Sequence, residues 1–284
     1  MKYYSAISKP ALALGLALSV QTTTHAQHGH LSAGAVGTNQ NDQLIWANGA
    51  DFVASSHYVK TLLYTNGGRY ADYYQGGITP TALPATLPNA GPDPAAAALG
   101  SYLQFSLACL EGPDGGTFNF WESTGATPVL SLAPGETSAK HWPLSENDGS
   151  PGSDPYGHVH GRRFTATKAG IYKIGFTAHD TSANGAGGGP IHKPSAQLPV
   201  WFQAGVNFAS IEPDYEEGHV HLHFGAAAGY SWQVEYSRQL GSAANWLPAE
   251  NPVTGADYFT AVIHDVPPGE ERFYRIKGTA LPPP

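Results

Sequence analysis

Glycine and proline make up a fifth of this sequence, and their abundance constrains the fold more than any other feature. The chain has 34 glycines and 23 prolines among 284 residues. Both residues interrupt helices and favour turns, and no window has a sustained helical period of apolar residues. Between the turns lie short runs rich in β-branched and aromatic residues. The sequence therefore predicts an all-β protein whose short strands are joined by many turns.

The apolar runs fall into two successive groups. The first group favours a β-sandwich domain over residues 27–205, and the second favours a smaller β-sandwich module over residues 206–284. Between two strands of the first group, the Pro- and Ala-rich stretch Thr81–Leu99 is predicted to form a long surface loop. The predicted strands are Leu44–Trp46, Val59–Tyr64, Tyr102–Leu110, Thr117–Trp121, Val129–Leu132, Arg163–Thr167, Gly170–Ala178, Val200–Ala204, His219–Phe224, Tyr230–Ser237, Asn245–Leu247, Phe259–His264 and Arg272–Lys277.

Residues 1–26 have the three parts of a secretory signal peptide. Lys2 and Lys9 supply positive charge, Pro10–Val20 is an apolar run of 11 residues, and Ala26 ends a small-residue cleavage motif. The apolar run is too short to cross a hydrocarbon core of about 30 Å. We therefore expect cleavage near Ala26 and a mature chain that is secreted, periplasmic or on the cell surface and has no transmembrane segment.

The mature chain is acidic and has a single thiol. Loss of the two signal lysines changes the formal net charge from −8 to −10, with 12 basic and 22 acidic residues. Such a charge disfavours nucleic acids and anionic membranes as partners. Cys109 has no second cysteine with which to form an intrachain disulfide, and its apolar, strand-like surroundings predict a buried and inert thiol.

The histidines indicate metal chemistry. The chain has 13, of which twelve follow the predicted cleavage point. His158 and His160 form an H-x-H motif between Gly157 and Gly161. In a strand, such residues point to the same face about 6–7 Å apart, so both imidazoles could bind one ion through bonds of about 2.0–2.1 Å. The alternative is a solvated pair at the start of a strand.

A hairpin would bring a third histidine to this motif. Residues 158–167 and 170–179 could pair about the turn that begins at Lys168, which would place His179 opposite one of the two motif histidines. A one-residue bulge would change that register. His179 could equally be an ordinary histidine at a strand edge.

Two more histidines are candidate ligands for the same ion. His192 lies in a glycine-rich loop that is flexible enough to return it to the motif, and His30 forms a second H-x-H motif with His28 near the mature N-terminus. The alternatives are a loop histidine and a histidine in a terminal tail. Cleavage after Gln27 instead of Ala26 would make His28 the first residue, whose amine and ring could chelate copper.

One predicted strand of the second module alternates histidines with apolar residues. Alternation directs the two sets to opposite faces, so the apolar set would enter the core of the module. The histidine face could be a second metal site, a pH-sensitive patch or a solvated surface. The histidines are His219, His221 and His223, and the apolar residues are Val220, Leu222 and Phe224.

Five stretches of the first group match a known family, namely residues 30–35, 44–49, 74–84, 144–172 and 180–192. They resemble the bacterial exported proteins that are repressed by the zinc uptake regulator, many of which carry a PEP-CTERM surface-sorting tail. The resemblance implies a zinc-binding role outside the cytoplasm, induced when zinc is scarce. It also implies zinc ligation by His158, His160, His192 and His30.

The second module carries a different pattern. It has Ser231–Ser237 with an internal tryptophan, then Asn245-Trp-Leu-Pro, then the run from Asp265 to Ile276. This pattern resembles the fibronectin-III-like modules that are appended to many secreted bacterial proteins. The resemblance implies architecture and not activity. The module stands where the family's sorting tail would be expected.

These features together predict an exported protein that captures or buffers Zn²⁺ outside the cytoplasm under zinc limitation. Imidazole ligands would also suit Cu²⁺ or Ni²⁺. A zinc transporter or an outer-membrane receptor would be the partner that takes up the ion. We expect no enzymatic activity, because the sequence has neither an HExxH nor a G-x-S-x-G motif.

Two other functions fit the sequence less well. A metal-dependent hydrolase would need a base beside the ion, and Glu146 or Asp154 could serve. An adhesion or carbohydrate-binding surface protein would use exposed aromatic side chains on the sandwich, for which the candidates are Tyr73, Tyr74, Trp121 and Trp142.

Histidine ligation makes a prediction about pH. Metal binding requires neutral imidazoles, so protons compete with the ion in acid. We expect the affinity for Zn²⁺ to fall strongly between about pH 7.5 and about pH 5.5, as measured by competition with a chromophoric chelator. An affinity that is unchanged over this interval would contradict histidine ligation.

Overall fold

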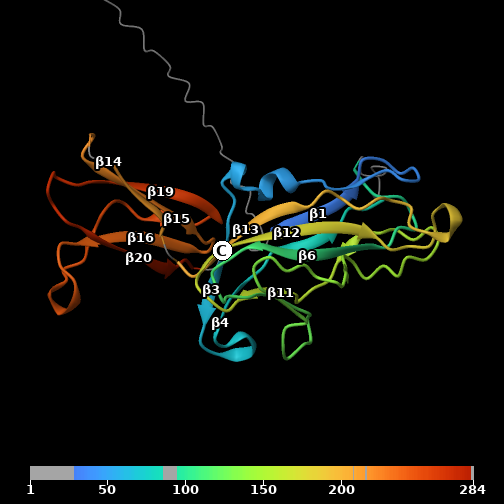
Figure 1. The fold of residues 1–284 in the computed structure, drawn as a ribbon, viewed down its shortest axis with the longest axis horizontal. Helices are drawn as coiled ribbons and strands as arrows, with labels where there is room; N and C mark the ends of the chain where they lie inside the picture. The colour runs from blue at the N-terminus through green and yellow to red at the C-terminus, as the bar shows by residue number, and fades with distance from the viewer. Residues whose placement is uncertain (1–28, 86–94, 207, 215, 283–284) are drawn as a thin grey trace, which may run out of the picture.

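The computed structural model describes residues 29–85, 95–206, 208–214 and 216–282. The predicted signal peptide and His28 lie outside these residues. The described chain is built almost wholly from β-strands, as predicted, and it forms two lobes (Figure 1). None of its helices has the length and apolar character that a membrane span requires.

The described elements are twenty strands and five short 3-10 helices. The strands are β1 (His30–Ala35), β2 (Leu44–Trp46), β3 (Lys60–Thr65), β4 (Tyr73–Gly76), β5 (Thr79–Ala82), β6 (Leu103–Glu111), β7 (Phe118–Trp121), β8 (Leu130–Leu132), β9 (Trp142–Pro143), β10 (Gly157–His158), β11 (Arg163–Ala166), β12 (Gly170–Asp180), β13 (Leu198–Ala204), β14 (Phe208–Asp214), β15 (His219–Ala226), β16 (Tyr230–Ser237), β17 (Leu247–Pro248), β18 (Val253–Thr254), β19 (Tyr258–Asp265) and β20 (Phe273–Ala280). The 3-10 helices are η1 (Gly49–Phe52), η2 (Ala54–Ser56), η3 (Gly68–Tyr70), η4 (Ala186–Gly188) and η5 (Gly241–Ala243).

The larger lobe is organised around a nine-stranded sheet in the order β8-β7-β11-β4-β3-β13-β12-β6-β9. The sheet curls so that aromatic side chains from its two halves meet. Phe118 lies 4.8 Å from Phe202 between ring centroids, and Phe164 lies 5.8 Å from Phe176. All four side chains are almost fully buried, and burial of one such ring contributes about 1.5–3 kcal/mol. This aromatic core gives the lobe its sandwich character.

The predicted hairpin about Lys168 is wrong. Strand β11 pairs with β4 and β7, whereas β12 pairs with β6 and β13. The chain crosses the aromatic core between them, because both strands have an apolar face to bury. Gly170 permits the crossing: its φ is 137°, and a Cβ there would lie 2.6 Å from the side chain of Pro113.

A four-stranded sheet in the order β10-β5-β1-β2 covers part of the larger lobe. Its strand β5 begins the stretch that was predicted to be a loop, and Thr81 is 7% exposed. The loop prediction is therefore wrong at this end, and residues 86–94 of the predicted loop lie outside the described residues.

Strand β5 tolerates Pro80 although proline has no N–H to donate. Thr79 and Leu83 donate their N–H groups toward β1, so the nitrogen of Pro80 faces the opposite side of β5, toward β10. Strand β10 pairs only with Thr81 and Ala82, so no hydrogen bond is lost at Pro80.

Several side-chain placements also test the sequence predictions. Cys109 is fully buried, as predicted, and burial raises the pKa of its thiol to about 11. Trp121 and Trp142 are 2% and 7% exposed, so the expectation that they lie on the surface is wrong. The ring of Trp142 packs within the aromatic core against Phe105 and Phe120. The ring of Trp121 is instead covered by Tyr70 and Tyr73.

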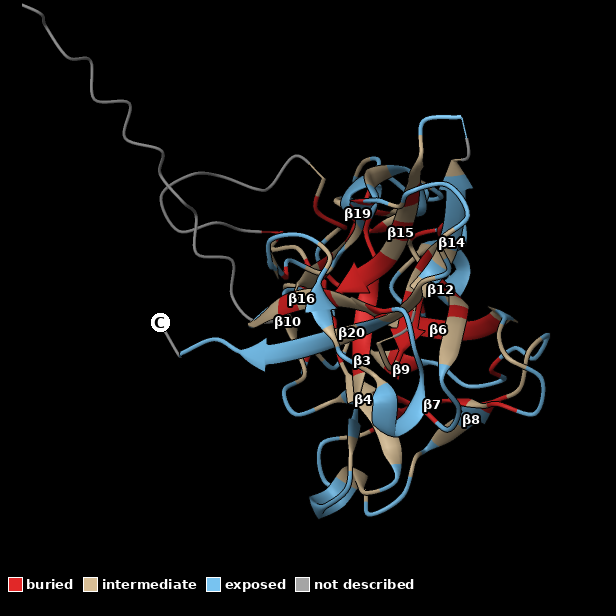
Figure 2. Cartoon of the chain, turned by 90° about the vertical axis from the view of Figure 1, so that its left-hand side faces the viewer, coloured by how far each residue is buried: buried red, intermediate tan, exposed pale blue. Residues whose placement is uncertain are grey.

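The smaller lobe contains two facing sheets, β14-β15-β19 and β17-β16-β18, and β20 is added beside β16. Its core includes Leu222 and Phe224 from the first sheet and Trp232 and Val234 from the second. Figure 2 shows buried residues along β15 and a largely exposed β20. The lobe is thus a small β-sandwich. The predicted boundary at Gly205 falls between the two cores.

A buried ion pair joins the two lobes. Lys60 Nζ lies 2.6 Å from Asp257 Oδ2, and the two side chains are 9% and 14% exposed. Beside the pair, the N–H of Val59 donates to the carbonyl of Asp257, and the N–H of Gly225 donates to the side chain of Gln203. Such a pair is costly to break one partner at a time, because the remaining charge stays buried.

The ion pair makes a prediction about stability. We expect Asp257→Asn to lower the free energy of unfolding by about 2–4 kcal/mol, since asparagine keeps the left-handed backbone at this position (φ 59°) but loses the charge. The double variant Lys60→Met/Asp257→Asn should recover about 1 kcal/mol or more of this loss. Urea unfolding measures both values. A double variant that is no more stable than Asp257→Asn would contradict a coupled pair.

Candidate metal centre

The two histidines of the H-x-H motif face each other in the structure, although not as predicted. Strand β10 ends at His158, and His160 lies in the turn that follows, so the two do not share a strand face. The turn nevertheless brings their ring centroids to 4.3 Å, with the ring planes inclined by 64°. Inclined imidazoles can direct their in-plane lone pairs to one point.

Strand β5 brings His30 to the same place. His30 pairs with Thr79 across the parallel β1–β5 ladder, and His158 pairs with Thr81 across the antiparallel β10–β5 ladder. Paired residues share a face, and so do residues two apart on one strand. His30 and His158 therefore lie on one face on either side of β5. Their ring centroids are 5.1 Å apart, and their planes are inclined by 84°.

A hydrogen-bonded loop delivers the chain to His158. The side-chain amide of Asn147 donates to the carbonyl of Asp154, and the hydroxyl of Ser145 donates to the carbonyl of Pro155 at 2.9 Å. Gly157 follows with a φ of 131°, and a Cβ there would lie 3.2 Å from Ser145. Only glycine adopts this backbone readily.

Arg162 anchors the other side of the motif. Its guanidinium forms two hydrogen bonds with Glu122, at 2.9 and 2.8 Å, and a third with the carbonyl of Pro143. The same group lies over the rings of Phe105 and Phe120, at 5.9 and 5.6 Å. The arginine side chain is only 7% exposed. The turn that carries the second motif histidine is thereby fixed to the aromatic core.

Asn48 fixes the backbone at His30. Its amide donates to the carbonyl of His30, and its side-chain oxygen accepts from the N–H of Ser32, each at 2.8 Å. Sequence reasoning gave this asparagine no role. The only signal was its position in a short stretch, residues 44–49, that resembles the zinc-binding family.

A small cavity opens beside the motif. It has a volume of about 210 Å³, and its lining includes His158, His160, Arg163 and residues 77–80. His158 and His160 thus lie beside solvent, where an ion or a water molecule can reach them.

His179 lies elsewhere, opposite Gln104 on the neighbouring strand β6. Its ring stacks on His141 with centroids 4.0 Å apart and planes inclined by only 11°, and its Nε2 shares a hydrogen bond of 2.8 Å with Ser106. Stacked imidazoles direct their lone pairs side by side, not to a common point. The structure therefore does not join His179 to the motif.

His192 is 2% exposed, and both of its ring nitrogens contact the backbone. Nε2 accepts the N–H of Ala98 at 2.9 Å, and Nδ1 lies 3.1 Å from the carbonyl of Asp42. Its own N–H donates to Asp180. These contacts give His192 a structural role between three segments of the described chain.

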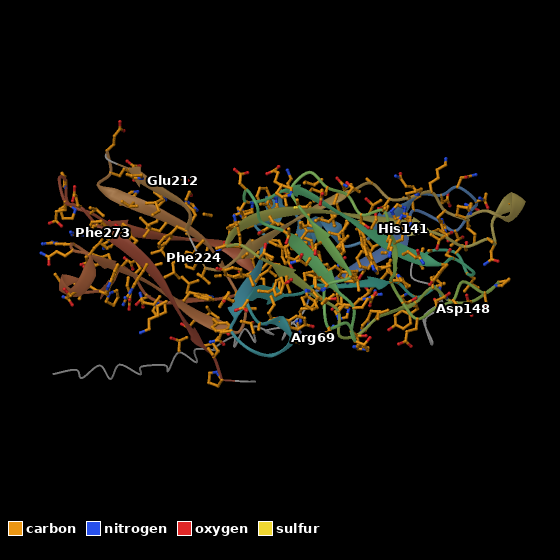
Figure 3. All side chains as sticks on the ribbon, turned by 60° about the horizontal axis from the view of Figure 1, so that its bottom comes forward. Arg69, His141, Asp148, Glu212, Phe224 and Phe273 are labelled. Atoms are coloured by element: carbon orange, nitrogen blue, oxygen red, sulfur yellow. The ribbon has the colours of Figure 1, made fainter. Side chains whose placement is uncertain are left out.

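The three alternating histidines of the smaller lobe lie on β15. Their apolar neighbours Val220, Leu222 and Phe224 are buried, so the predicted alternation is confirmed. Figure 3 labels Glu212 and Phe224 in this lobe and His141 in the other. Strand β15 pairs with β14 and β19 of the smaller lobe, so His219, His221 and His223 are separate from the histidine group around β5.

The His141–His179 stack makes a prediction about acid stability. Burial, and secondarily the charge of His141, lowers the pKa of His179 to about 4. An unfolded histidine takes up its proton near pH 6.5, so between these values the unfolded state binds more protons and stability falls as the pH falls. We expect His179→Gln to remove about 1–2 kcal/mol of the loss in unfolding free energy between about pH 7 and about pH 4.5, after allowing for solvent screening.

Urea unfolding of the wild type and His179→Gln at about pH 7 and about pH 4.5 tests this expectation. Glutamine can still bond to Ser106, so the comparison isolates the proton. If both proteins lose the same stability, the His179 ring is not the group that matters.

Comparison with known proteins does not identify a relative that would explain this geometry. Neither a protein-family model nor a curated protein matches the sequence. The resemblance to exported zinc-binding proteins therefore stays a sequence prediction, and the functional interpretation depends on the histidine group that β5 assembles.

Proposed function

We propose that this protein captures or buffers Zn²⁺ outside the cytoplasm, and that His30, His158 and His160 bind the ion. One observation carries the proposal: the ring of His158 contacts the ring of His160 and also the ring of His30, which is more than 120 residues away in the sequence and is brought close by pairing through β5. Imidazole nitrogen is a preferred ligand of zinc, and zinc sites with three protein ligands keep one position open.

The way the site is held supports a binding role. Each histidine is fixed from outside the group, by the Asn48 amide, by the loop of Asn147, and by the Arg162 anchor. Ligand residues whose backbone is held before the ion arrives lose less conformational freedom on binding. Such fixed surroundings around ligands also tune their affinity for metal.

The chemistry of the ligands favours reversible capture. Histidines without a thiolate bind Zn²⁺ less tightly than cysteine sites do, and they release it when protonated. Export, as residues 1–26 predict, would place the site where scarce zinc is first met. A transporter or receptor that accepts the ion is the partner that this role requires.

Removal of the motif histidines tests the proposal. We expect His158→Ala/His160→Ala to bind one equivalent of Zn²⁺ fewer than the wild type, because two of three ligands are lost. The measurement is elemental analysis together with competition against a chromophoric chelator. The rings are partly exposed, so circular dichroism should show an intact fold.

A matched control uses a histidine outside the group. His57 is exposed and adopts a left-handed backbone with φ 61°, which asparagine tolerates. His57→Asn should keep the full zinc content. Equal zinc content in the wild type and His158→Ala/His160→Ala would overturn the proposal.

A further inference from the structure

A second group of metal-ligand side chains lies on the smaller lobe. Strands β14 and β15 form an antiparallel pair in which Asp214 lies directly opposite His219, and His221 is two residues further along the same face. One ligand atom from each of the three residues lies within 4.8 Å of the others. The group is separate from the histidines around β5 and does not depend on the proposed function.

The spacing of the two imidazoles suits an ion. Nε2 of His219 and Nε2 of His221 are 3.0 Å apart, and the ring planes are inclined by 61°. Two nitrogen ligands of a tetrahedral ion lie about 3.3 Å apart when each bond is about 2.0 Å long. The separation of the two nitrogens would therefore change by only a few tenths of an ångström when an ion replaces their hydrogen bond.

The carboxylate is held in position by the turn between the strands. Oδ1 of Asp214 accepts the N–H groups of Glu216 and Glu217, at 3.1 and 3.0 Å. These contacts orient the carboxylate toward the histidines before any ion is present. Glu217 adds negative charge, because its Oε2 lies 3.6 Å from Nε2 of His219.

His223, the third histidine of the strand, does not belong to this group. Its ring is stacked on His221 with centroids 6.2 Å apart and planes inclined by 9°, and its Nε2 lies 3.8 Å from Glu212. The group therefore contains two of the three histidines of β15, and its third member is Asp214 of the adjacent strand.

One side of the group faces a cleft. The cleft has a volume of about 550 Å³, and both Asp214 and His219 line it, together with the apolar residues Pro267, Pro268 and Phe273. An ion held by two histidines and one carboxylate retains exchangeable positions. Here the cleft provides room for a water molecule or a small ligand at such a position.

We propose that Asp214, His219 and His221 form a second metal site, which binds a divalent transition-metal ion and leaves an exchangeable position toward the cleft. The ligand set of two imidazoles and one carboxylate is shared by zinc and iron(II) sites with open positions. The formal charge of −8 for the whole chain favours cations in general.

The test is a titration of the metal-free protein, without its signal peptide, with Co²⁺, whose visible absorption reports nitrogen coordination, and with Zn²⁺ by competition. We expect the wild type to bind two equivalents and His219→Ala/His221→Ala to bind one. Asp214→Asn should weaken the second equivalent about tenfold or more, because asparagine can still accept the N–H groups of the turn but lacks the charge.

His223→Ala is the matched control, since it removes a histidine from the same strand face and should leave both equivalents intact. Two equivalents in His219→Ala/His221→Ala, with a wild-type circular dichroism spectrum, would overturn the inference. A single wild-type equivalent that disappears only in His158→Ala/His160→Ala would also overturn it while supporting the proposed function. A single equivalent that disappears only in His219→Ala/His221→Ala would support the inference and contradict the proposed function.

Discussion

Contact between aromatic rings across the curled nine-stranded sheet is the interaction on which the larger lobe depends. Phenylalanines from β6, β7, β11, β12 and β13 meet in one layer, and they hold the two halves of the sheet together. The strand that follows the H-x-H motif is part of this layer through Phe164. The position of the motif is therefore set by the core and not by local turn geometry alone.

The candidate metal centre shows how a short strand can join distant parts of a chain. On β5, Thr79 pairs with His30 of β1 and Thr81 pairs with His158 of β10. Strand pairing brings His30 and His158 together and the turn after β10 adds His160, while the contacts of Arg162 and Asn48 hold the adjoining backbone. The arrangement places rigidity in the supports and leaves the imidazoles beside solvent.

Alternation of polar and apolar residues predicted much of the fold. Tyr230–Ser237 and Leu44–Trp46 are strands with the predicted bounds, and the buried face of β15 was foreseen from Val220, Leu222 and Phe224. Alternation reports which face of a strand is buried and says nothing of which strand lies beside it. This is why the hairpin predicted about Lys168 is wrong. Proximity in sequence favours a local strand pair, whereas in the structure the two strands lie across the core from each other and bury their apolar faces there.

The site was only partly predictable, because sequence patterns show spacing along one strand but not which strands become neighbours. His158, His160 and His30 could be named because histidines two apart are a visible pattern, although the turn and not a strand face unites the first two. His192 was named as a ligand, but a buried ring that bonds two backbone groups has no signature in sequence. Asp214 was missed, because its partnership with His219 depends on the register of a neighbouring strand.

The joint between the lobes has a consequence for how such a protein can change over time. Appended modules can often be exchanged independently when few contacts cross between them. Here Lys60 and Gln203 of one lobe are completed by Asp257 and Gly225 of the other. A different module grafted after Gly205 would lack the carboxylate that Lys60 pairs with and the Gly225 N–H that Gln203 accepts. Exchange of the smaller lobe is therefore constrained by the groups that a new module places beside Lys60 and Gln203.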